Sequence, residues 1–379
     1  MVIPPFRFDL PVDVRFGDGV AADLAGAVAE LGGRRPVAVV EQPLAATQPL
    51  AASLAGIGVV VKPAGEPTVE LVERIRGEVQ ERRPDVLIAI GGGSALDVGK
   101  AVRAVLGRRL DFSGLLDGTR PVELPTLPLI AVPTTSGTGS EVSGGAVMAD
   151  PASGRKLGVA SPLMRAQIAL VDPLLTAGLP ATATMATGVD ALAQAIGAVT
   201  VRNGSPASVA LGLEACRVIA GALAAAVHDG ADRAARSAMS LGSLTAGLAM
   251  NLSDCGADHA LGHASGAVLH LPHGLAVGLT LAEALDVTRR AVPEPMERVA
   301  DALGEPPGGA GDGARAVAAV RRLLSAVGFP SATAAGMLAG HVQAMTALAL
   351  DDYCLGVDAY RWTAEDVRGA FAAALSGTR

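Results

Sequence analysis

Aromatic side chains, clustered basic residues and paired cysteines are all scarce in this chain of 379 residues. Aromatics make up 2% of it and the net charge is −7, with no basic run, which argues against a nucleic-acid-binding surface. The cysteines are Cys216, Cys255 and Cys354. Their wide spacing predicts neither a disulfide framework nor a zinc-type cysteine pair. Small buried side chains are the favoured interpretation, and a place near the active site is the alternative for Cys255 and Cys354.

Long uninterrupted apolar runs are also missing, although half of the residues are apolar. No stretch of about 18 apolar residues stands out as a membrane span. The N-terminal residues lack the basic and apolar blocks of a signal peptide. We therefore expect a soluble cytoplasmic protein with neither a membrane nor a nucleic acid as partner.

The pattern of the chain changes near residues 172–182. Before this point short apolar segments alternate with helical patterns, and after it Ala- and Leu-rich helical patterns continue to the end. The pattern predicts an α/β domain over residues 1–178 and an all-helical domain over residues 179–379. Strands are expected at 14–16, 36–40, 57–61, 85–90, 127–132 and 168–171, with a hairpin of 142–149 and 156–159 turning around 150–154; helices are expected at 21–31 and 68–81.

One strand runs directly into a glycine-rich loop. Residues 85–90 are followed by Gly91-Gly92-Gly93-Ser94, which opens the next helix. Glycines allow a close backbone approach to a phosphate, and the N–H groups of a helix N-terminus face an anion. Ser94 is expected as N-cap or phosphate donor, with Asp97 in the first helical turn. A tight turn without a ligand is the alternative, because neither standard nucleotide-binding glycine motif is matched.

Two further strand ends carry polar residues. Glu41 follows the strand 36–40, where an acidic side chain can accept hydrogen bonds from a ribose 2′-hydroxyl and repel a 2′-phosphate. The loop 133–141 follows the strand 127–132 and carries five hydroxyl side chains. Ligands of open α/β sheets gather at such carboxyl ends of strands.

Four of the six histidines fall between residues 259 and 273. His259 and His263 are four residues apart and share one helix face, as do Asp190 and Gln194 on an earlier helix. Together with His273 these side chains predict either metal binding or proton transfer. Each histidine taken alone would be interpreted as an ordinary polar residue of a helix.

The motifs together resemble the iron-containing (group III) alcohol dehydrogenase family over nearly the whole chain. The matching segments are Phe16–Gly19, 91–100, 133–141, 171–173, 187–192 and 259–274. The resemblance implies an N-terminal α/β dinucleotide-binding domain plus an all-α C-terminal domain, the dehydroquinate synthase-like architecture, with the active site in the cleft between them. It also implies a small alcohol, aldehyde or keto substrate. A homodimer is the default expectation for such an enzyme, although the sequence itself does not indicate the oligomeric state.

The resemblance assigns roles to individual residues. His263 corresponds to a histidine near the substrate that is suited to proton relay. Asp190, His259 and His273 correspond to three of the four ligands of a divalent metal, Fe²⁺ or Zn²⁺, and Gln194 stands in the fourth ligand position. The residues that would contact NAD(H) are Glu41, Gly92, Gly93, Ser94, Asp97, Thr134, Thr135, Thr138, Ser143 and Lys156.

Three positions depart from the family pattern, one of them Gly197, which stands where the family continues Ala-Ile with Glu. Gln194 replaces a histidine, and an amide carbonyl is a weaker and harder ligand than imidazole, which either disfavours Fe²⁺ or Zn²⁺ relative to harder ions or lowers the affinity for any metal. Val357-Asp358-Ala359 stands where the family has Asn-Pro-Arg.

The leading hypothesis is an NAD(H)-dependent alcohol dehydrogenase or aldehyde reductase in which a divalent metal assists hydride transfer. A metal-independent reductase similar to maleylacetate reductases is the first alternative. An NAD-using lyase or cyclase similar to dehydroquinate synthase is the second, and a non-catalytic binding protein is the third.

Overall fold

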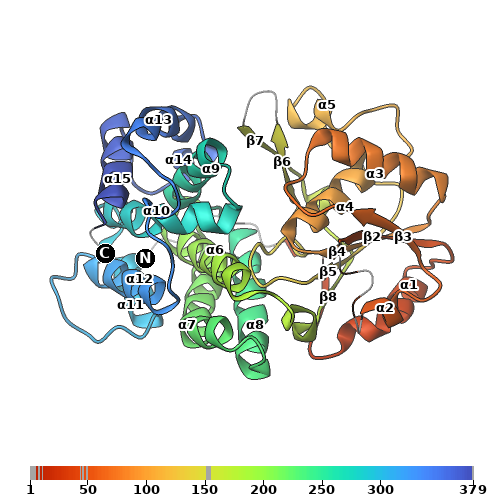
Figure 1. Ribbon diagram of the computed structural model, residues 1–379, viewed down its shortest axis with the longest axis horizontal. Coiled ribbons are helices and arrows are strands. Elements are labelled where there is room, and N and C mark those ends of the chain that lie inside the picture. The colour runs from red at the N-terminus through yellow and green to blue at the C-terminus, as the bar shows by residue number, and fades with distance from the viewer. Residues whose placement is uncertain are drawn as a thin grey trace. The chain divides into compact units, whose positions relative to one another are not determined.

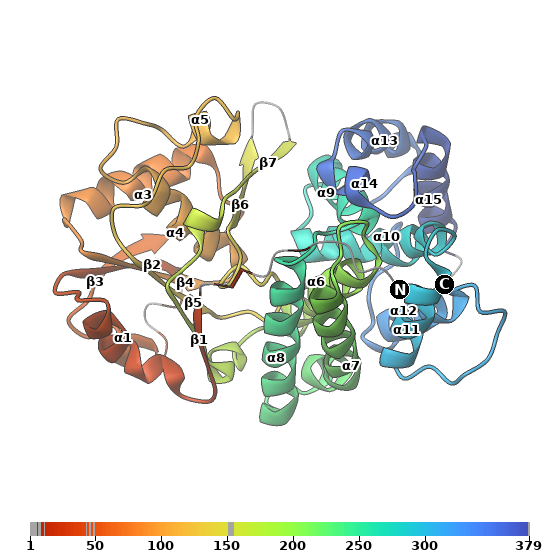
Figure 2. The ribbon, with the colours of Figure 1, turned by 180° about the vertical axis from the view of Figure 1, so that it is seen from behind.

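The computed structural model describes residues 6, 9, 10, 12–42, 44, 47, 50–150 and 155–377 (Figures 1 and 2). The chain divides into two compact units. One is Leu10–Gly178, and the other holds Leu179–Arg379 together with Phe6 and Asp9. The first unit contains all the described strands and the second is helical. The predicted fold class, an α/β part followed by an all-α part, is therefore confirmed.

Six strands of the first unit form one parallel sheet in the order β1-β8-β5-β4-β2-β3. Two more strands, β6 and β7, form an antiparallel pair, as the expected hairpin required. The expected turn at residues 151–154 lies outside the described residues. The strands are β1 (Asp13–Phe16), β2 (Pro36–Glu41), β3 (Gly58–Lys62), β4 (Val86–Gly91), β5 (Leu129–Pro133), β6 (Gly145–Asp150), β7 (Arg155–Ala160) and β8 (Ile168–Val171).

Alternate side chains of the parallel strands enter two apolar cores on opposite faces of the sheet. Val39 and Ala89 pack beneath α3 and α4, whereas Val40 and Ile90 pack beneath α1 and α2, which cover the other face (Figure 1). Burial on both faces explains why these strands are continuous apolar runs. The helical segments of this unit are η1 (Val20–Asp23), α1 (Leu24–Glu30), α2 (Leu50–Ser53), α3 (Val69–Glu81), α4 (Gly93–Val105), α5 (Ser113–Leu116), η3 (Pro162–Met164) and η4 (Pro173–Thr176).

The strand order reverses between β2 and β4. From β2 the chain moves outward to β3, then returns to the other side of β2 and continues through β4 to β5. A crevice forms outside the carboxyl ends of two such strands, and ligands of open α/β sheets bind there. Glu41 ends β2 and Gly91 ends β4, so two of the predicted nucleotide-binding segments lie at this switch point.

The second unit is a helical bundle around α6, which contacts α7, α8 and α10. Gly262 brings α9 close to α10, because a Cβ there would lie 2.6 Å from a methyl of Val277. The helices are α6 (Ala181–Thr200), α7 (Pro206–His228), α8 (Arg233–Met250), α9 (Ala257–Leu269), α10 (His273–Thr288), α11 (Pro293–Ala302), α12 (Ala314–Ala326), η5 (Ala339–His341), α13 (Val342–Leu350), α14 (Tyr353–Val357) and α15 (Ala364–Ser376).

Helix α7 is the one described helix long and apolar enough to cross a membrane, by length and composition alone. It packs against α6 and α8 and contributes Cys216, Ile219 and Leu223 to the helical core. Its apolar character is thus that expected of a core helix in a bundle.

Candidate functional site

The glycine-rich loop between β4 and α4 has a conformation that requires glycine. Gly91 has a φ of 147°, and a Cβ on it would lie 2.6 Å from the Ala95 Cβ. Gly92, rather than Ser94, is the N-cap of α4, so the expectation that Ser94 caps the helix was wrong. Helix α4 starts two residues earlier than that role needs, and the Ser94 hydroxyl donates instead to the Gly65 carbonyl at 3.0 Å.

The hydroxyl-rich loop after β5 lies directly against this glycine loop. The Thr134 N–H donates to the Gly91 carbonyl at 3.0 Å. A Cβ on Gly93 would lie 2.5 Å from the Thr138 methyl, and one on Gly92 would lie 3.2 Å from the Thr135 methyl. Two segments that the sequence separates by about forty residues therefore form one surface of amides and hydroxyls.

Glu41 joins this surface from the end of β2. Its Oε2 accepts a hydrogen bond from the Gly92 N–H at 3.0 Å, and its Oε1 pairs with the fully buried Lys62 ammonium at 3.1 Å. Lys62 also donates to the carbonyls of Pro63 and Gly65. Lys62 was not predicted from the sequence. It ends an apolar strand, as Glu41 does, and two neighbouring strands that end in opposite charges could have indicated this ion pair.

Asp97 braces the loops from within α4. It lies beyond the first turn, contrary to expectation, because α4 begins at Gly93. Its Oδ1 accepts from the Ser140 hydroxyl at 2.6 Å and pairs with Lys100 at 3.0 Å, while its Oδ2 accepts from the Val147 N–H. Lys100 is buried and also donates to the Ser143 hydroxyl at 3.2 Å. The carboxylate is thus engaged with the protein's own loops.

Lys156 on β7 pairs with Glu66 at 3.2 Å. Glu66 adjoins Gly65, whose carbonyl accepts from both Ser94 and Lys62. The segment between β3 and α3 therefore borders the predicted cofactor residues, and sequence reasoning assigned it no role.

In the helical unit, Asp190, His259 and His273 come together. One donor atom from each lies within 4.8 Å of the other two. The Nε2 atoms of both histidines lie 3.4 Å from Asp190 Oδ1. Asp190 and His259 are buried and His273 is 28% exposed, so the group is closed except on the His273 side. Gln194 lies one turn beyond Asp190 on α6 and is also buried.

Close helix packing and a neighbouring carboxylate hold these donors. His273 is the first residue of α10, and a Cβ on the adjacent Gly274 would lie 2.3 Å from the Ala186 carbonyl oxygen of α6. Only glycine allows this approach, which brings His273 to Asp190. Asp258 Oδ2 lies 2.6 Å from the Nδ1 of His259 and turns its Nε2 toward Asp190. Carboxylates orient metal-binding histidines in this way.

Three buried atoms of this group have no hydrogen-bond partner among the described residues. They are Asp190 Oδ1, Gln194 Oε1 and His259 Nε2. A separation of 3.4 Å between Asp190 Oδ1 and His259 Nε2 is too long for a normal hydrogen bond. Buried polar atoms without partners are costly and rare, and a cation among two carbonyl-type oxygens and imidazole nitrogens would satisfy them. The residues present fit a divalent metal.

The electrostatics of the group favour a bound cation. Burial raises the pKa of Asp190, but the facing His273 and His259 outweigh it and lower the pKa well below its usual range. Burial lowers the pKa of His259, yet Cys255, Asp258 and Asp190 raise it well above its usual value. Without a metal this pocket therefore attracts a proton, and a metal ion supplies the same positive charge.

His263 stands beside the donor group with its own carboxylate. Its ring centroid lies 5.2 Å from that of His273 and 6.1 Å from that of His259. Its Nδ1 lies 2.8 Å from Asp352 Oδ2. Burial is the largest influence and lowers the pKa of His263, against the opposing effect of Asp352. His270, whose role the sequence left open, is exposed and ends α9 with a φ of 54°.

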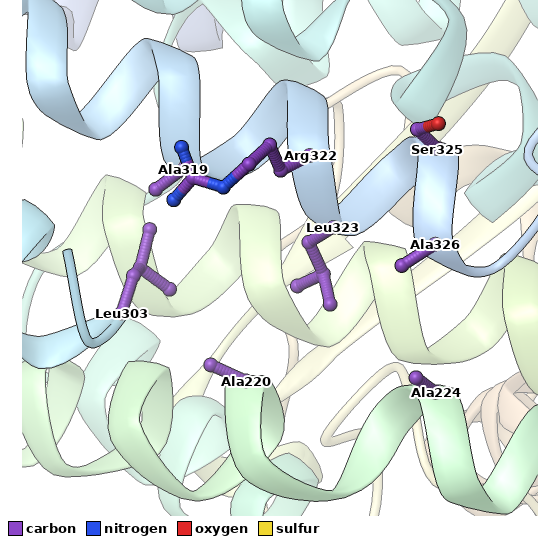
Figure 3. A pocket seen from close by; sticks show the side chains of 8 residues that line it. All are labelled: Ala220, Ala224, Leu303, Ala319, Arg322, Leu323, Ser325 and Ala326. Carbon is purple, nitrogen blue, oxygen red and sulfur yellow. The ribbon is translucent and has the colours of Figure 1, made fainter.

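A separate groove of about 530 Å³ lies between α7 and α12 (Figure 3). Small alanines of both helices face across it, and its one charged side chain, Arg322, pairs with Glu305. It contains none of the predicted site residues, and its only hydroxyl group is that of Ser325. The lining residues are Ala220, Ala224, Leu303, Ala319, Arg322, Leu323, Ser325 and Ala326.

A glycine-rich loop at a sheet switch point and a cluster of metal donors are the parts expected of a dinucleotide-dependent oxidoreductase. Residues 11–173 match the family model for iron-containing alcohol dehydrogenase, and residues 184–375 match the model for the C-terminal part of that family. The chain belongs to the iron-containing alcohol dehydrogenase family.

Individual relatives agree with the family assignment. A probable alcohol dehydrogenase, EutG, of Salmonella typhimurium is 37% identical over 86% of this chain and 83% of its own length. An NAD-dependent methanol dehydrogenase of Bacillus methanolicus is 30% identical over 95% of this chain and 97% of its own. The solved structure of an alcohol dehydrogenase from Oenococcus oeni has a TM-score of 0.92 at 29% identity, covering 98% and 100% of the two chains. The predicted family is confirmed, and the chain is an oxidoreductase that acts on CH–OH groups.

Proposed function

We propose that this protein is an NAD(H)-dependent alcohol dehydrogenase or aldehyde reductase that works with a divalent metal in its helical unit. The observation that carries the metal assignment is the set of three buried, unpartnered donor atoms on Asp190, Gln194 and His259. The observation that carries the cofactor assignment is the glycine loop at the β2–β4 switch point, bounded by Glu41.

The α/β unit binds the dinucleotide through backbone and hydroxyl groups. NAD(H) accepts or donates the hydride when bound. The N–H groups at the start of α4, around Gly93 and Ser94, have no partner within the helix and point toward an anion such as a pyrophosphate. Thr135 and Thr138 border the same loop. Glu41, held by Lys62 and Gly92, places a carboxylate where it would accept from a ribose 2′-hydroxyl and disfavour a 2′-phosphate.

The residues of the helical unit that would hold the metal are Asp190, His259 and His273, with the Gln194 carbonyl as a fourth donor. A divalent ion held by these residues would supply Lewis-acid polarisation of the substrate oxygen. The family name points to Fe²⁺, and Zn²⁺ suits the same donors. The amide oxygen of Gln194 shifts preference toward harder ions than a third imidazole would.

His263 moves the alcohol proton. Asp352 accepts a hydrogen bond from Nδ1–H, which fixes the neutral tautomer and leaves Nε2 as the acceptor. Because burial lowers the pKa of His263, the ring is neutral near pH 7 and ready to take a proton. Asp352 then stabilises the imidazolium that forms, as a carboxylate does for a general-base histidine.

The test is NADH oxidation over a panel of aldehydes, with metal content measured on protein purified without chelator. We expect net conversion of NADH to NAD⁺, loss of turnover on chelation and recovery with one divalent ion. Turnover unaffected by complete metal removal would favour the metal-independent reductase. Cofactor that cycles with no net oxidation would favour a lyase or cyclase.

A matched pair of variants separates proton relay from general damage. His263→Asn removes the relay, whereas His270→Asn changes an exposed histidine in a left-handed conformation that asparagine tolerates. We expect His263→Asn to lower kcat by roughly 10²–10⁴-fold, the usual worth of a positioned acid or base, and His270→Asn to leave it unchanged.

A further inference from the structure

A second group of metal-donor side chains lies beside the first. One donor atom each from His263, Asp352 and Cys354 lies within 4.8 Å of the other two. His263 belongs to α9, and the other two lie at the start of α14. All three are partly buried, with His263 at 24% and Asp352 at 19% exposure. The group is thus sheltered yet open to an ion from solvent.

The geometry of the group comes from one helix cap. Asp352 is the N-cap of α14, and its Oδ1 accepts from the Cys354 N–H at 2.8 Å. Its Oδ2 lies 2.8 Å from His263 Nδ1. The cap therefore holds the carboxylate between the thiol two residues later and the imidazole of another helix. An imidazole nitrogen and a carboxylate oxygen 2.8 Å apart are close enough to bind one ion.

The chemistry of this group differs from that of the first. Asp190, Gln194, His259 and His273 offer only oxygen and nitrogen, whereas the second group adds a sulfur. Thiolate and imidazole together select Zn²⁺ and similar thiophilic ions over harder ones.

We propose that His263, Asp352 and Cys354 form a second divalent-metal site, selective for thiophilic ions such as Zn²⁺, with one position open to solvent. Binding replaces the thiol proton of Cys354 and the proton between His263 and Asp352, and both pass to solvent. The site requires no substrate, cofactor or turnover. On the proposed function it has one consequence: an ion bound at Nδ1 separates His263 from Asp352 and adds positive charge to the imidazole, so Nε2 becomes a weaker proton acceptor and excess Zn²⁺ inhibits the enzyme.

Cobalt(II) is the probe that distinguishes the two groups, because a cobalt–thiolate bond gives an intense near-ultraviolet charge-transfer band and cobalt bound by oxygen and nitrogen alone does not. Metal-free Asp190→Asn protein, in which the first group is impaired, is titrated with Co²⁺. We expect the band to saturate at one ion per chain and Zn²⁺ to abolish it. Asp352→Asn, in the same background, should weaken Co²⁺ binding at least about tenfold, or 1.4 kcal/mol.

The decisive control uses the neighbouring thiol. Cys255 interacts with His259 of the first group and lies 3.2 Å from the sulfur of Met250. In the same background, Cys354→Ser should remove the band and Cys255→Ser should keep it. No band, or a band lost with Cys255 and kept without Cys354, overturns the proposal. Because the readout needs no turnover, failure of the proposed enzymatic function leaves this test intact.

Discussion

Stripping the metal from the first donor group should destabilise the helical unit by a measurable amount. The unpartnered atoms of Asp190, Gln194 and His259 are buried in the bundle. Leaving a buried polar atom unsatisfied costs about 1–3 kcal/mol, so three such atoms cost roughly 3–9 kcal/mol as an upper bound. These atoms come together only in the folded state, so the folded protein binds the ion more tightly than the unfolded protein does. A ligand that binds in this way stabilises the folded state.

The size of the effect follows from linkage. At a free metal concentration of one hundred times the Kd, a ligand that binds only the folded state stabilises it by about 2.7 kcal/mol. For a unit of this size, each kcal/mol raises Tm by roughly 2–4 °C, so the expected shift is roughly 5–11 °C. Differential scanning calorimetry of chelator-stripped and metal-loaded protein measures it. Cys354→Ser is the background, so that only the first group responds.

The variants that accompany this measurement are matched in charge and size. Asp190→Asn removes the anionic ligand and should abolish the metal-dependent shift, whereas Asp301→Asn changes an exposed aspartate of the same unit and should keep it. A shift of less than about 1 °C with each of Fe²⁺, Zn²⁺, Co²⁺ and Mn²⁺ would refute the reasoning from unpartnered atoms. An equal shift in Asp190→Asn would place the ion elsewhere.

Three more outcomes are expected. Glu41→Gln should raise the kcat/KM ratio of NADPH to NADH, because the neutral amide no longer repels a 2′-phosphate; an unchanged ratio counts against its selecting role. Gly93→Ala should raise the KM for NADH, since its Cβ would meet Thr138 at 2.5 Å, while Gly77→Ala, which meets nothing within 4 Å, should not. Asp358→Ala should lower the free energy of unfolding by roughly 2–4 kcal/mol, because the buried carboxylate accepts hydrogen bonds from the N–H groups of Ala257 and Tyr360. Asp358→Asn should lower it by less. Urea titration measures both losses, and equal losses would contradict this reasoning.

Asp358 also shows how the departure from the family's Asn-Pro-Arg is accommodated. Its carboxylate receives the Ala257 N–H at the first residue of α9 and the Thr288 hydroxyl at the end of α10. A Cβ on Gly256 would lie 2.9 Å from that carboxylate, so a glycine is needed as the N-cap. The motif indicated a local difference, and the structure shows a brace for the helix that carries His259.

Local patterns in the sequence predicted most of the sheet. The apolar runs that became β2, β4 and β5 were placed within one or two residues, because strands buried on both faces leave a strong continuous signal. Helix starts were less predictable. Asp97 was expected in the first turn of α4, and Ser94 either at its cap or as a phosphate donor. Gly92 caps the helix instead, since packing of the glycine loop on Thr135 and Thr138 decides where the helix begins.

By itself the sequence determined the fold class, the family and the residue types available for chemistry. Spacing of four along a helix already placed His259 with His263, and Asp190 with Gln194, because helical periodicity is a local property. Only the tertiary structure decided which of them meet. The approach of α10 to α6 at Gly274 brought His273 to Asp190, and the cap of α14 brought Asp352 and Cys354 to His263 across about ninety residues of chain. Such contacts depend on how helices pack, and no local pattern encodes them.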